Sequence, residues 1–91
     1  MKTVLPLLAE YLGTFLLTLA LLSLSNPLFL GIVFAVILFL ILPVSGGCIN
    51  PAISFAMYLK GKLGLKECIY YILIQLFAAG SSFYVFKWVT L

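Results

Sequence analysis

Long apolar runs separated by short polar breaks dominate the chain, and no charged residue lies between Glu10 and Lys60. The apolar runs cover residues 5–24, 28–43 and 67–87. A helix of about 20 apolar residues rises about 30 Å, which is enough to cross the hydrocarbon core of a bilayer. The pattern therefore predicts three transmembrane helices, of which the second is short for a full span.

A turn and a short helix are expected between the second run and the third. The segment reads Ser45, Gly46, Gly47, Cys48, Ile49, Asn50, Pro51, Ala52. Pro43 is expected to end the preceding helix, and the glycines permit a tight turn. Asn50 is a good N-cap and Pro51 a good first residue for a helix over 51–59. Such a helix is about 14 Å long, roughly half the bilayer core, which favours a re-entrant segment over 45–59.

Composition places the chain in a bilayer. Hydrophobic residues make up 66% of the 91 residues and charged residues 8%, whereas soluble domains carry about 25% charged residues. The sequence has no histidine and two cysteines, so neither a metal site, a cofactor, a disulfide framework nor a catalytic centre is expected. The net charge of +3 is not gathered into a patch that suggests nucleic acid. Residues 1–91 are expected to form a single unit, with lipid as its surroundings.

The lysines predict an orientation. Lys2, Lys60, Lys62 and Lys66 would share one side of the membrane, and Lys87 the other. Because cytoplasmic loops are rich in lysine, the N-terminus and the loop 60–67 are expected in the cytoplasm. Four aromatic residues suit the two interfacial belts: Tyr70, Tyr71, Tyr84 and Trp88.

Polar and small residues mark the expected helix contacts. Glu10, Gly13 and Thr14 lie on one face of the first helix, and a carboxyl group facing lipid would be costly. This face is therefore expected to point into protein, where small residues permit close approach. Gly31 in the second helix and Gly80 in the third are further expected packing positions.

Three motifs resemble those of the aquaporins, or major intrinsic proteins. The pattern Ser45-Gly46-x-x-x-Asn50-Pro51-Ala52 resembles the signature of the family's first half. Residues 9–15, with Glu10 and Gly13, resemble the first-helix motif Ala-Glu-x-x-Gly-Thr-Phe, and residues 71–75 resemble a third-helix pattern that ends in glutamine. Order and spacing agree across nearly all of the chain.

The resemblance implies an all-α membrane fold, namely half of an aquaporin-like fold with three transmembrane helices and one re-entrant half-helix. It implies that Asn50 donates its side-chain amide to water at a constriction. Glu10 and Gln75 would brace the re-entrant loop by bonding its backbone. The implied function is passive transport of water or small neutral solutes such as glycerol. The positive end of the half-helix would repel cations there.

The chain departs from the family pattern in two respects. Ile53 follows the motif, as in a first half, whereas the family's second motif is followed by an arginine, and this sequence contains none. Cys48 stands where the family often has histidine. A pore is expected to need a second half, supplied by an antiparallel copy or by a separate second-half protein, with a higher oligomer as a further option. The lysine bias of four to one opposes insertion in both orientations.

Two other functions stay open at this point. A small proton-coupled exporter could use Glu10 as its proton-binding carboxylate, in the manner of the small multidrug resistance transporters, although those have four spans. A non-transporting membrane protein, holin-like or regulatory, would also fit three apolar segments and a basic loop. Such a protein would tolerate changes at residues 45–52.

Overall fold

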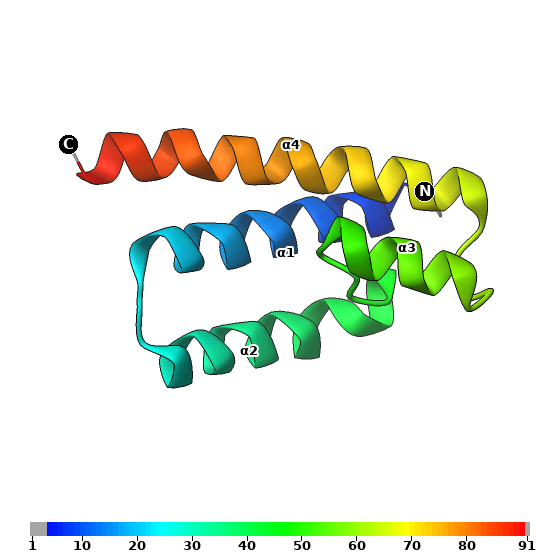
Figure 1. The fold of residues 1–91 in the computed structure, drawn as a ribbon, viewed down its shortest axis with the longest axis horizontal. Coiled ribbons are helices and arrows are strands. Elements are labelled where there is room, and N and C mark those ends of the chain that lie inside the picture. Colours follow the sequence, from blue (N-terminus) through cyan, green and yellow to red (C-terminus); the bar gives the residue numbers. More distant parts are fainter. Residues whose placement is uncertain (1–3, 91) are drawn as a thin grey trace.

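The computed structural model describes residues 4–90 and folds them into four helices joined by short connections (Figure 1). The helices are α1 (Val4–Ser23), α2 (Pro27–Ser45), α3 (Pro51–Leu59) and α4 (Leu65–Thr90). Within the described part of the chain, α1, α2 and α4 are long and apolar enough to cross a membrane. The expected fold class, three spans and one half-length helix, is confirmed.

Asparagine begins both α2 and α3. The Asn26 side chain accepts hydrogen bonds from the main chain of Leu28 and Phe29, at 2.9 and 3.1 Å. Asn50 accepts one from the main chain of Ala52, at 2.8 Å. A proline follows each asparagine, where its missing N–H costs nothing and its fixed φ suits the first turn.

The expectation that α2 ends at Pro43 is wrong, because the helix continues to Ser45. A proline inside a helix removes one hydrogen-bond donor, but the residues after it can still donate. Gly46 donates its N–H to the carbonyl of Leu42 at 2.9 Å and takes a left-handed conformation, with φ of 88°. Gly46 therefore ends the helix in the way that glycine commonly does.

The first helix is the centre of the fold, since α1 packs against both α2 and α4, while α3 packs against α4. Gly13 permits the contact with α2, because a Cβ there would lie 2.8 Å from atoms of both Ile41 and Ile49. Gly31 and Gly80 are different, since a Cβ on either would meet nothing within 4 Å. The structure shows no close approach at these two glycines, and a helix-packing role for them stays a prediction.

Several polar side chains are buried and many large apolar side chains are exposed, the reverse of a soluble protein. The buried polar residues are Glu10, Thr14, Ser54, Gln75 and Ser82. Large apolar side chains face outward instead, with Leu28 exposed by 74% and Phe39 by 83%. Lipid tails are the solvent in which such a surface is stable, so the fold is that of an integral membrane protein. Lys2, part of the orientation argument, lies outside the described residues.

Candidate functional site

The loop between α2 and α3 has an unusual backbone. Gly46, Gly47 and Ile49 have positive φ angles of 88°, 67° and 44°. Glycine adopts such angles freely, but for a β-branched residue they are an outlier that costs about 1–3 kcal/mol. The surroundings hold Ile49 in place, because its side chain is 2% exposed and fits beside Gly13.

Glu10 holds this loop from α1. Its Oε2 accepts hydrogen bonds from the Ser45 hydroxyl at 2.5 Å and the Cys48 main chain at 3.1 Å. Its Oε1 accepts from the Ile49 main chain at 2.6 Å and from Gln75 Nε2 at 2.9 Å. The carboxyl group is fully buried, so these donors replace water. Main-chain N–H groups of an irregular loop thereby find acceptors that lipid cannot offer.

Two residues of α4 extend the network. Gln75 Nε2 also donates to the Ser54 hydroxyl of α3 at 2.8 Å, and Tyr71 donates its hydroxyl proton to the Ser45 carbonyl at 2.9 Å. The expectation that Tyr71 lies in an interfacial belt is wrong, because the side chain is 6% exposed. Sequence reasoning also missed Ser54. The spacing of four residues from Tyr71 to Gln75 and from Asn50 to Ser54 was the available signal.

Smaller contacts complete the loop. Gly47 donates its N–H to the Ser45 hydroxyl oxygen at 3.3 Å, and the Cys68 thiol donates to the Ser54 carbonyl at 3.6 Å. Cys48 is 3% exposed. Within residues 4–90, no group of three or more His, Cys, Asp or Glu side chains could hold a metal ion.

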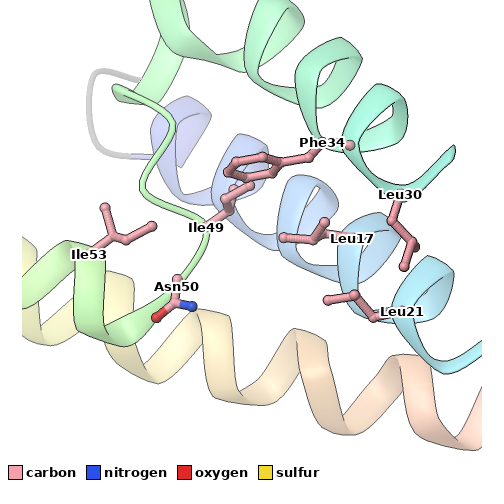
Figure 2. Close-up of a pocket in the computed structure, with 8 residues that line it drawn as sticks. Leu17, Leu21, Leu30, Phe34, Ile49, Asn50 and Ile53 are labelled. Atoms are coloured by element: carbon pink, nitrogen blue, oxygen red, sulfur yellow. The ribbon is translucent and has the colours of Figure 1, made fainter. Parts of the chain in front are cut away.

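Asn50 presents a hydrogen-bond donor at the exposed start of α3. Its Oδ1 is bound to the Ala52 main chain, so its Nδ2 points away from the helix (Figure 2). Among the described residues, this nitrogen donates no hydrogen bond. The N-terminus of a helix carries about half a positive charge. The site at Asn50 therefore offers both an amide donor and a positive potential.

A largely apolar groove of about 310 Å³ begins at Asn50 and runs between α1 and α2 (Figure 2). It is lined by Leu17, Leu21, Leu30, Gly31, Phe34, Ile49, Asn50 and Ile53. Asn50 is the polar side chain in this lining. Such a surface can offer a small molecule a hydrogen bond from the Asn50 amide and otherwise mainly apolar contact.

The fold and this site define an integral membrane protein organised around a re-entrant loop that a buried carboxyl group holds. The family model named Major intrinsic protein matches residues 1–90, so the chain belongs to this family. The resemblance seen in the sequence is confirmed. The family consists of channels rather than enzymes, which supports a non-enzymatic role.

Plant aquaporins are among the similar proteins. Aquaporin PIP1-1 of Arabidopsis thaliana and aquaporin PIP1.1 of Vicia faba are each 41% identical to this chain over 49 residues. That stretch covers 54% of this chain and 17% of each relative. Aquaporin PIP1-3/PIP1-4 of Zea mays has the same identity, over 54% of this chain and 16% of its own length. The chain thus spans a small part of these relatives, and no solved structure matches it significantly.

Proposed function

We propose that this chain forms one half of a membrane channel for the passive passage of water or small neutral solutes such as glycerol. The observation that carries the proposal is the Asn50 side chain. Its oxygen caps α3, which leaves its amide nitrogen to face an apolar groove. A passing water replaces part of its hydrogen bonding at this nitrogen, and the helix end repels cations.

The same residues support this function over a proton-coupled exporter. Glu10 would have to exchange protons with water, but its carboxyl group is fully buried and both its oxygens accept hydrogen bonds. A proton on either oxygen would compete with donors that hold the loop. The ordered loop likewise favours a channel over a holin-like or regulatory protein, which has no need of a fixed backbone at membrane depth.

A second half in inverted orientation would close the groove, in keeping with the inverted repeats of membrane transporters. The candidates are an antiparallel copy of this chain and a separate second-half protein. The loop 60–67, with three lysines, would face the cytoplasm, and Lys87 the opposite side. The substitutions Gly61→Cys and Lys87→Cys, made one at a time, test this orientation and the choice of partner in sealed vesicles. Labelling of each from one side supports a separate partner, whereas labelling of each from both sides supports antiparallel copies.

Swelling of reconstituted vesicles tests the channel itself, with Asn50→Asp as the variant. Aspartate preserves the helix cap but removes the amide donor. We expect water flux to fall about tenfold, which corresponds to one hydrogen bond of about 1.4 kcal/mol. Asn26→Asp is the matched control, since Asn26 caps α2 in the same way and does not line the groove. Equal water flux in the two variants would contradict the proposal.

A further inference from the structure

A second cavity, of about 280 Å³, lies between the start of the loop and the C-terminal end of α3 with the residues that follow it. It is lined by Ser45, Gly46, Cys48, Met57, Lys60, Lys62 and Leu63. Two of these side chains carry a full positive charge. The groove at Asn50 has no charged residue in its lining, so the two cavities differ in kind.

Both cavities lie along one face of α3. Asn50 and Ile53 line the first, whereas Met57 and Lys60 line the second. Steps of three, four and three residues keep these positions on one side of a helix. The loop contributes to both cavities as well, because Ile49 lines the first and Cys48 the second. The two cavities therefore follow one another along the same face of α3.

Negative charge gathers around this second cavity. α2 ends at Ser45 and α3 ends at Leu59, and each helix C-terminus carries about half a negative charge. These two helix ends give this side of the loop a negative potential that would draw cations toward it. Lys60 and Lys62 bring two positive charges that oppose this potential.

We infer that Lys60 and Lys62 set the charge selectivity of this mouth, where they keep cations away from the path that Asn50 lines. The inference rests on the proposed channel function. The sequence contains no arginine, so these two lysines would supply the positive charge that excludes cations. The other charged side chains of the described residues do not line the cavity. Lys66 lies over the ring of Tyr70, at 5.8 Å, while Glu67 lies beside Gly64, and neither lines the cavity.

Cys48 provides a reporter inside the same cavity. In a Cys68→Ala background, its labelling rates with an anionic sulfonate and a cationic trimethylammonium methanethiosulfonate reagent are compared. Both reagents attack the same thiolate, so the ratio of rates depends on the local potential and not on the ionisation of Cys48. We expect Lys60→Gln/Lys62→Gln to lower the anionic-to-cationic ratio about fivefold, as two charges within one Debye length would.

Lys66→Gln and Lys87→Gln are the matched controls, since each removes one charge outside the cavity. The ratio in these variants should stay within about twofold of the parent, and the fivefold effect should vanish in 1 M salt, where the Debye length is about 3 Å. A double variant that behaves like the controls would overturn the inference. Failure of both reagents to reach Cys48 would overturn it as well, because the cavity would then be closed to solutes.

Reconstituted vesicles separate this inference from the channel proposal. We expect permeability to methylammonium to rise severalfold in Lys60→Gln/Lys62→Gln relative to Lys66→Gln. Normal water flux in the parent with no rise in methylammonium permeability would overturn the inference and leave the channel proposal standing. No water flux from the parent, either alone or together with the second-half protein that the labelling experiment would call for, would overturn both.

Discussion

Replacement of Glu10 by glutamine tests whether the re-entrant loop depends on the carboxylate. Oε2 of Glu10 accepts from the Ser45 hydroxyl and the Cys48 main chain, and Oε1 from the Ile49 main chain and Gln75. A glutamine retains one acceptor oxygen and places an NH₂ group where the other stood. At least one main-chain N–H then faces a donor in a site that water does not reach.

The magnitude follows from that unsatisfied group. A buried donor without a partner costs about 1–3 kcal/mol, and hydrogen bonds to charged groups are worth about 1.5–3 kcal/mol. Hydrogen bonds between membrane helices average only about 0.6 kcal/mol, because the unfolded state in the membrane also finds partners. The Ser45 hydroxyl and the Gln75 amide can reorient, which limits the loss. We therefore expect Glu10→Gln to destabilise the loop by about 2 kcal/mol, a factor of about thirty in the equilibrium constant.

Opening of the loop can be followed through Cys68. Its side chain is 3% exposed, and its thiol donates a hydrogen bond to the Ser54 carbonyl beside the network. In a Cys48→Ala background, the rate of labelling by a neutral thiol reagent is measured as the SDS fraction of mixed micelles rises. Glu67→Gln is the matched control, because Glu67 is the other acidic residue of the chain and is exposed. If Glu10→Gln and Glu67→Gln open at the same SDS fraction, the loop does not depend on the carboxylate.

Two further pairs of variants probe the contacts of α1 by the same measurement. Thr14→Val should stabilise the fold by about 1 kcal/mol, because the buried Thr14 hydroxyl has no hydrogen-bond partner among the described residues. Thr18→Val should destabilise it by about 0.6 kcal/mol, because the hydroxyl lies 2.7 Å from that of Ser82, and shifts of equal sign would contradict this reading. Gly13→Ala should cost about 1–3 kcal/mol, since the new Cβ would lie 2.8 Å from two isoleucine side chains. Gly80→Ala meets nothing within 4 Å and should gain up to about 1 kcal/mol of helix stability, so a loss as large as that of Gly13→Ala would refute the argument.

The fold class could be predicted because its causes are local. A bilayer imposes one requirement on every spanning segment, namely an apolar run of sufficient length, and α1, α2 and α4 carry that signal in their composition. The start of α3 is local too, since Asn50 caps the helix and Pro51 fits its first turn.

Pro43 and Tyr71 show where local reasoning fails. At Pro43 the sequence rule concerns a lost donor, but a helix can continue for half a turn when a left-handed glycine closes it. At Tyr71 the rule concerns aromatic residues near the end of an apolar run, yet this hydroxyl finds a carbonyl at Ser45, which is 26 residues away in the chain. A partner that distant leaves no trace in the surrounding composition.

The conformation of Ile49 depends most on the assembled fold. Nothing in the sequence indicates that a β-branched residue takes a φ of 44°, because its intrinsic preference is against it. Two features of the fold oppose that preference, namely the hydrogen bond from the Ile49 main chain to Glu10 and the space that Gly13 leaves for the Ile49 side chain. The strained residue directs the chain from the loop into α3, so the placement of the Asn50 amide depends on the buried carboxyl group of another helix. Changes at Glu10 should therefore act on the groove without touching its lining.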